Sequence, residues 1–230
     1  MRSLRLALAC AALLVSAAAG CGMIPHLLYG KRIAGQVVDA YTGQPIAGAH
    51  VAYLWESTIN PSGFTGHSAR TICYHAAAAV TDAQGRFEIP AWRKWSTYDV
   101  DNRDPNGLLY APNYVPQQLV LIEGKIKPPV ERLNERYDLK PFSGTVDERM
   151  NMLFFGLANR ACDYGGESKK DLYSMLKAIH DEARQIARTH NQDITVSIIA
   201  EIAADAALAG DPNGPANDAQ TDAFIKEHLK

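Results

Sequence analysis

The stretch IAGQVVDAYTGQPIAGAHV, residues 33–51, decides the fold. Apolar residues alternate with polar or small ones at 33–37 and again at 46–51, which is typical of strands that bury one face. The TGQP segment between them contains a glycine, which adopts positive φ at little cost, and a proline, which presets one turn dihedral. The stretch therefore predicts two β-strands separated by a turn.

Two later stretches extend this pattern. In AVTDAQGRFEIP, residues 79–90, DAQG predicts a tight turn between apolar residues at 79–80 and 87–89. Farther on, LLYAPNYVPQQLVLIEG, residues 108–124, predicts a last pair of short strands. Short strands separated by turns indicate an antiparallel β-sandwich, which we place at residues 32–143.

These three motifs resemble the carboxypeptidase regulatory-like domain, a transthyretin-like β-sandwich. The resemblance covers residues 33 to about 122, and one position departs from it, because Asn113 replaces the glycine of an A-P-G-Y element. It implies a fold and no reaction, because the matched residues are scaffold residues. They are Gly35, Val37, Asp39, Thr42, Gly43, Pro45, Gly48, Ala49 and Val51 in the opening, with Thr81, Asp82, Gly85 and Phe87 in a predicted hairpin.

From residue 144 to residue 230 the sequence changes to helical periodicity. Thr145 and Glu148 have the spacing of a capping box, and helices are predicted within 145–161, 167–189 and 194–209. The second is the most amphipathic, with one face formed by Leu172, Met175, Leu176, Ile179, Ala183 and Ile186. The predicted fold class is therefore α+β: an N-terminal antiparallel sandwich with a C-terminal helical segment packed on it.

The first 20 residues have the three parts of a secretory signal peptide. Arg2 and Arg5 precede an apolar stretch at 6–15 and small residues at 16–20. Residues 18–21 resemble the lipobox of bacterial lipoproteins, which implies that Cys21 is acylated and that residues 21–31 form a tether. The alternative is an ordinary signal peptide cut near Ala19, with Cys21 an incidental thiol. Either way the sequence predicts export.

Acylation of Cys21 would anchor the chain to a membrane of the bacterial cell envelope. Because no aspartate follows Cys21, the expected destination is the outer membrane, facing the periplasm. In that oxidising compartment, Cys73 and Cys162 are predicted to form a disulfide. Two buried free thiols are the alternative.

Charge argues against nucleic-acid binding. Loss of residues 1–20 removes Arg2 and Arg5 and no acidic residue, so the formal charge changes from −2 to −4. A mildly acidic protein has no general attraction for phosphate backbones. The partners expected are the membrane, through the lipid anchor, and a carbohydrate, peptide or protein; no cofactor is expected.

Residues 91–109 are interpreted as a loop inserted into the sandwich. Trp92, Trp95 and Tyr98 are the candidate ligand-binding residues, because aromatic rings stack on sugars and grip peptides. The alternative is that both tryptophans pack back onto the sandwich. Three carboxylates in the same segment, those of Asp99, Asp101 and Asp104, form a loose calcium-binding pattern, for which a solvated turn is the alternative.

No catalytic motif is present in the sequence, neither G-x-S-x-G nor H-E-x-x-H. His180 is followed by two acidic residues, and we interpret the three as a solvent-facing part of a helix. The sequence therefore predicts a noncatalytic envelope lipoprotein with a structural or binding module. The alternatives are an envelope hydrolase with its site between sandwich and helices, and a calcium-binding module.

Overall fold

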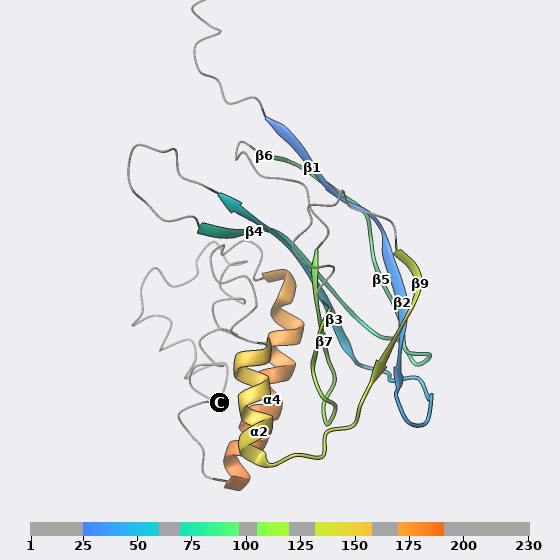
Figure 1. Ribbon diagram of the computed structural model, residues 1–230, viewed down its shortest axis with the longest axis vertical. Helices are drawn as coiled ribbons and strands as arrows, with labels where there is room; N and C mark the ends of the chain where they lie inside the picture. Colours follow the sequence, from blue (N-terminus) through green and yellow to red (C-terminus); the bar gives the residue numbers. More distant parts are fainter. Residues whose placement is uncertain (1–24, 60–69, 97–104, 120–131, 158–169, 191–230) are drawn as a thin grey trace, which may run out of the picture.

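The computed structural model describes residues 25–59, 70–96, 105–119, 132–157 and 170–190 (Figure 1). Several predictions fall outside these ranges: the signal peptide, Cys21, Tyr98, the three loop aspartates, Cys162 and the helix at 194–209. They stay predictions. Where the chain is described, it is mostly β-sheet with helices, as an α+β or a mainly-β fold has.

Strands of the described ranges form three sheets. A two-stranded ribbon consists of β1 (His26–Gly30) and β6 (Trp92–Ser96). A three-stranded sheet has the order β5 (Arg86–Ile89), β2 (Ile33–Asp39), β9 (Arg132–Leu139). A four-stranded sheet has the order β4 (Arg70–Val80), β3 (His50–Ile59), β7 (Asn106–Tyr110), β8 (Gln117–Leu119).

One pairing departs from the prediction of antiparallel strands only. β2 pairs with β9 in parallel, whereas β2 and β5 are antiparallel. β9 was not predicted from the sequence, because RLNERYDL carries charges at several positions and only Leu139 at its end is fully buried. A long connection separates β2 from β9 in the chain, and such a connection is what parallel pairing requires.

Both faces of the four-stranded sheet are covered. Along β3, Val51, Tyr53 and Trp55 belong to one apolar cluster and Ala52 and Leu54 to the other, as the two-residue period of a strand requires. The first cluster also contains side chains of the three-stranded sheet, and the second contains side chains of the helices. Figure 1 shows the same order in space, with the four-stranded sheet between the helices and β2, β5 and β9.

The first helix begins where the sequence predicts, whereas the second α-helix begins at Tyr173, later than the predicted start at residue 167. Thr145 caps α2 (Val146–Asn151) in a capping box: its hydroxyl accepts from the Glu148 amide and its own amide donates to the Glu148 carboxylate. A π-helical segment, Met152–Leu157, continues α2, and a short 3₁₀ turn, Lys170–Leu172, leads into α4 (Tyr173–His190). Their apolar side chains pack on a face of the four-stranded sheet.

The DAQG turn connects two sheets. The Gly85 amide donates to the Asp82 carbonyl at 2.9 Å, and the Asp82 carboxylate accepts from the amides of Gln84 and Arg86. The turn is therefore present, but β4 and β5 belong to different sheets, so the predicted hairpin is wrong. Gly85 has φ of 69°, and a Cβ on it would lie 2.4 Å from the Val37 carbonyl oxygen.

Replacing this glycine tests how tightly the turn is packed. We expect Gly85→Ala to lower the free energy of unfolding by about 2 kcal/mol, through left-handed strain and the clash with Val37. Gly48→Ala is the matched control, because Gly48 has φ of 74° but open space around its Cβ position. It should cost about 1 kcal/mol, from strain alone. Equal losses in urea denaturation would show that the contact with Val37 contributes nothing.

Candidate functional site

β1 and β6 form an antiparallel ribbon at the N-terminal end of the described chain. Leu27 pairs with Trp95, Leu28 with Lys94 and Gly30 with Trp92. Two predictions are corrected here. Residues 26–30 are a strand and no part of a free tether, and residues 92–96 are its partner strand and no part of an inserted loop. Both were missed because HLLYG and WRKWS are short and lack strict alternation.

The two tryptophans of β6 lie on opposite faces of this ribbon, because they are three positions apart in a strand. Trp92 is half-buried, whereas Trp95 is 69% exposed. Opposite Trp95 lies Leu27, which is 44% exposed, and the next pair on the same face is Tyr29 with Arg93. The structure therefore does not bring Trp92 and Trp95 into one binding surface.

Trp92 belongs to an aromatic cluster that we define as Trp55, Tyr74, His75 and Trp92. Its ring centroid lies 4.0 Å from that of His75, 5.2 Å from that of Trp55 and 6.2 Å from that of Tyr74. A β-bulge makes this possible: the pairing of β3 with β4 passes from His75 directly to Cys73, so that Tyr74 and His75 both reach Trp92. The cluster fastens the ribbon to the four-stranded sheet, so Trp92 packs as the structural alternative predicted.

Burial, with a smaller contribution from the Lys94 ammonium, lowers the pKa of His75 to about 4. An unfolded chain binds this proton at the ordinary pKa of 6.5, while the folded chain binds it only near 4. Acid therefore favours the unfolded state between these values, and the stabilisation is complete only above pH 6.5. Burial also lowers the pKa values of His50 and His180, which add to the effect in the same direction.

We expect the free energy of unfolding to fall as the pH is lowered from 7 towards 4. His75→Gln, which has no titrating proton, should make this fall shallower without removing it, because His50 and His180 still titrate. Urea denaturation across the range measures both slopes. A histidine NMR titration that placed the His75 midpoint at or above 6.5 would contradict the buried position of its ring.

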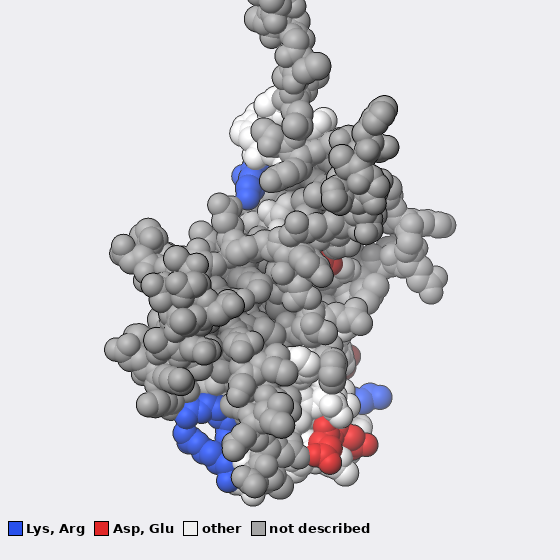
Figure 2. Space-filling view, turned by 90° about the vertical axis from the view of Figure 1, so that its left-hand side faces the viewer, with Lys and Arg blue, Asp and Glu red and all other residues white. Residues whose placement is uncertain are grey.

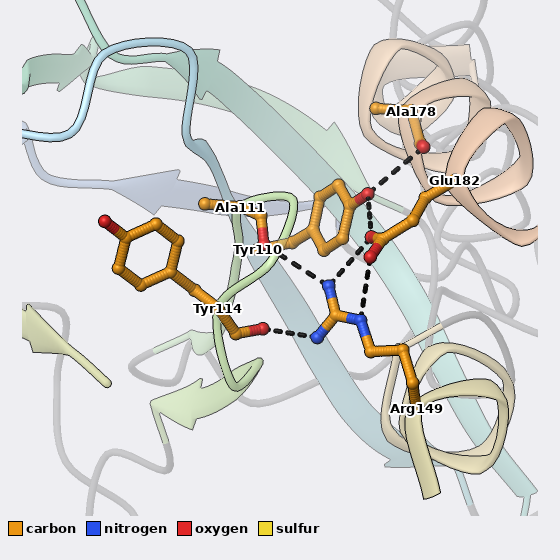
Figure 3. Close-up of polar contacts among 6 residues, drawn as sticks. All are labelled: Tyr110, Ala111, Tyr114, Arg149, Ala178 and Glu182. Atoms are coloured by element: carbon orange, nitrogen blue, oxygen red, sulfur yellow. Dashed lines mark hydrogen bonds and ion pairs between the residues drawn. The ribbon is translucent and has the colours of Figure 1, made fainter. Parts of the chain in front are cut away.

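A second candidate lies where the helices meet the four-stranded sheet. Arg149 of α2 and Glu182 of α4 form a two-point ion pair, with Nε to Oε1 at 2.8 Å and Nη2 to Oε2 at 2.8 Å (Figure 3). Their side chains are only 4% and 13% exposed. The remaining guanidinium donors reach the backbone carbonyls of Tyr114 and, at 3.4 Å, Ala111. This pair therefore ties two helices to the chain that follows β7.

The hydroxyl of Tyr110 on β7 completes this polar joint. It donates to Oε2 of Glu182 at 2.7 Å and lies 3.1 Å from the carbonyl oxygen of Ala178 (Figure 3). Burial, together with the neighbouring carboxylate, holds the pKa of Tyr110 far above its usual value. The phenol consequently stays protonated and the ion pair keeps a neutral neighbour. We call Tyr110, Arg149 and Glu182 the polar joint.

An open groove of about 590 Å³ runs beside the polar joint. Phe142, Val146 and Ile186 contribute apolar walls, and Asp181, Gln185 and Thr189 contribute polar ones. Arg149 lines it too, but its donors are already bonded to protein oxygens. The groove therefore lies beside the polar joint, and the Arg149 guanidinium in its wall is engaged in contacts within the protein.

Other sequence-predicted residues have different surroundings. His180 is buried, so its interpretation as part of a solvent-facing helix surface is wrong; burial lowers its pKa, and its Nδ1 lies 3.6 Å from the exposed Asp181. Cys73 is buried on β4 in the cluster beneath the helices, whereas its predicted disulfide partner Cys162 is not described.

Within the described ranges, no group of three or more His, Cys, Asp or Glu side chains is arranged to hold a metal ion. None of the described helices has the length and apolarity needed to span a membrane.

Comparisons with known proteins do not assign the chain to a family. No family model matches the chain, and a search of curated proteins finds no match. Among solved structures, 3-chlorocatechol 1,2-dioxygenase from Rhodococcus opacus 1CP is 13% identical with a TM-score of 0.29, and the match covers 49% of this chain and 61% of that one. A 9R-lipoxygenase from Cyanothece PCC8801 is 15% identical with a TM-score of 0.27, covering 70% of this chain and 24% of that one. The chain thus spans less than two thirds of either protein, and TM-scores this low carry no argument about fold or function.

Proposed function

We propose that this protein is a noncatalytic, lipid-anchored component of the bacterial cell envelope. Its body is a transthyretin-like β-sandwich of the carboxypeptidase regulatory-like type, widened by helices, and Cys21 carries the lipid. The sandwich is supported by the apolar cluster that the three-stranded and four-stranded sheets share. Among its members, Val37 and Phe87 come from one sheet and Val51 and Leu109 from the other.

The residues that carry the family resemblance hold turns and strands in place. Asp39 Oδ1 accepts from the amides of Tyr41 and Thr42 at 2.9 and 2.8 Å. The buried hydroxyl of Thr81 donates to the Ile46 carbonyl at 2.7 Å and accepts from the Ala49 amide at 2.8 Å. These contacts are what a scaffold motif requires, and they support the family assignment without adding chemistry.

The polar joint is the observation that carries the noncatalytic part of the proposal. A hydrolase built between sandwich and helices needs a nucleophile or base that can reach substrate. At that boundary Arg149, Glu182 and Tyr110 instead bond to one another and to backbone carbonyls. A buried, mutually satisfied set of this kind fixes the helices to the sheet.

Partition between detergent and water tests the proposed function. We expect the full chain, expressed in a bacterium with an outer membrane, to enter the detergent phase of a Triton X-114 extract. Cys21→Ser should move it to the aqueous phase, because the serine hydroxyl receives no acyl thioether and one or more buried chains are lost. Tyr41→Ser is the control, because Tyr41 is 75% exposed and lies outside both the lipobox and the β1–β6 ribbon. The same aqueous partition for the unchanged chain and for Cys21→Ser would contradict the anchor.

A further inference from the structure

The outer face of the β1–β6 ribbon carries exposed apolar and cationic side chains together. Trp95 and Leu27 are 69% and 44% exposed and lie directly opposite each other. Arg93 and Lys31 are exposed beside them, and the Lys31 ammonium lies 5.7 Å from the centre of the Tyr29 ring. Neither strand contains an acidic residue. An indole, a leucine and two cations on one small surface have the chemistry of a membrane–water interface.

The position of this surface in the chain points to the same partner. Four residues lie between Cys21 and His26, where β1 begins, so the five Cα–Cα steps of an extended chain span at most about 18 Å. An acyl group on Cys21 inserts into the lipid, so β1 must start within that distance of the headgroups. No other described strand follows Cys21 as closely in the sequence.

Charge distribution is compatible with this orientation. In Figure 2, the described atoms at the upper end of the view, at the height of β1 and β6 in Figure 1, are uncharged apart from a basic group. Acidic side chains on this face lie lower in the view, together with most of the visible basic ones. Anionic headgroups attract Lys and Arg near the surface, so an end whose described atoms in this view include a basic group and no acidic one suits a membrane containing them.

We propose that the outer face of the ribbon, formed by Leu27, Tyr29, Arg93 and Trp95, rests on the membrane that holds the lipid anchor. This inference depends on the proposed function, because it requires an acylated Cys21. The ribbon then gives the anchored body a fixed orientation: Trp95 and Leu27 enter the interface, Arg93 and Lys31 meet the headgroups, and the helices point away. Because Trp92 packs in the aromatic cluster, the ribbon and the four-stranded sheet keep the same orientation relative to the membrane.

Tryptophan quenching tests the contact. The full acylated chain is reconstituted in vesicles of zwitterionic and anionic phospholipid that carry a nitroxide near the headgroup. We expect roughly a third of the total emission to be quenched, because Trp95 is one of three tryptophans and the other two, Trp55 and Trp92, belong to the aromatic cluster on the other side of the ribbon. Trp95→Phe should abolish that component, and Leu27→Asp should weaken it.

The control is Leu133→Asp, because Leu133 on β9 is 43% exposed, almost as much as Leu27, and lies off the ribbon. It should leave the quenching unchanged, and far-ultraviolet circular dichroism of all variants should match that of the unchanged chain. A vesicle-bound chain whose Trp95 is not quenched, or whose Trp95 is protected only by an added protein or glycan, overturns the membrane contact while leaving the anchor intact. A chain that fails to bind vesicles at all overturns the proposed function and this inference with it.

Discussion

Truncating Leu108 or Leu109 to alanine is expected to lower the free energy of unfolding by about 3 kcal/mol in each case. These residues are adjacent on β7, so their side chains point to opposite faces of the four-stranded sheet. Leu108 belongs to the cluster beneath the helices and Leu109 to the cluster shared with the three-stranded sheet. Each truncation leaves a cavity in a packed core, and chemical denaturation measures both losses.

The contrast between adjacent positions makes this test specific. A sheet with one solvated face would show one large loss and one below about 1 kcal/mol. Leu133→Ala is the matched control, because its exposed leucine should lose only a few tenths of a kcal/mol, about what is typical of surface changes. A small loss of stability for Leu108→Ala alone would contradict the packing of the helices on the four-stranded sheet. A small loss for Leu109→Ala alone would contradict the proposed sandwich.

Arg149→Ala is expected to lower the free energy of unfolding by about 3–5 kcal/mol. The substitution leaves the Glu182 carboxylate buried without its cation and removes the donors to the Tyr114 and Ala111 carbonyls. Replacing both charges, as Arg149→Met with Glu182→Leu, should cost less than Arg149→Ala, because no uncompensated charge then remains. A double-mutant cycle in urea measures the coupling.

The control lies on α4, the helix that carries Glu182. Lys177 and Asp181 form an exposed ion pair at 2.7 Å, one turn apart on α4. Lys177→Ala should change the stability by less than about 0.5 kcal/mol, since solvent screens such pairs. If Arg149→Ala were as mild as Lys177→Ala, the polar joint would not hold the helices, and the boundary between helices and sheet would become available again for the hydrolase alternative.

The elements that follow simple periodicity were predictable from the sequence. Strands β2 and β3 and the capping box of Thr145 come directly from local patterns. The ribbon did not, because pairing between residues 26–30 and 92–96 joins segments about 66 positions apart and neither strand has a clear pattern alone. The sequence also did not show that the DAQG turn connects strands of two different sheets. The residues of a tight turn are the same whether or not the strands that it connects pair with each other.

The polar joint left a signal in the sequence that local reasoning did not use. Arg149 is four residues before Leu153, and Glu182 is three after Ile179 and four before Ile186, so each charge lies within the apolar stripe of its helix. A cation and a carboxylate in two apolar stripes predict that the helices meet there. Tyr110 gave no such signal, since an aromatic residue in a strand is ordinary core.

Mass spectrometry of the amino terminus tests the central claim, lipid anchoring, most directly. For chain extracted from the cell envelope, we expect the first residue to be Cys21 and its peptide to carry the added mass of acyl chains. An unmodified Cys21 thiol, found either behind an uncleaved leader or after a cut near Ala19, would contradict the anchor and the orientation inferred from it.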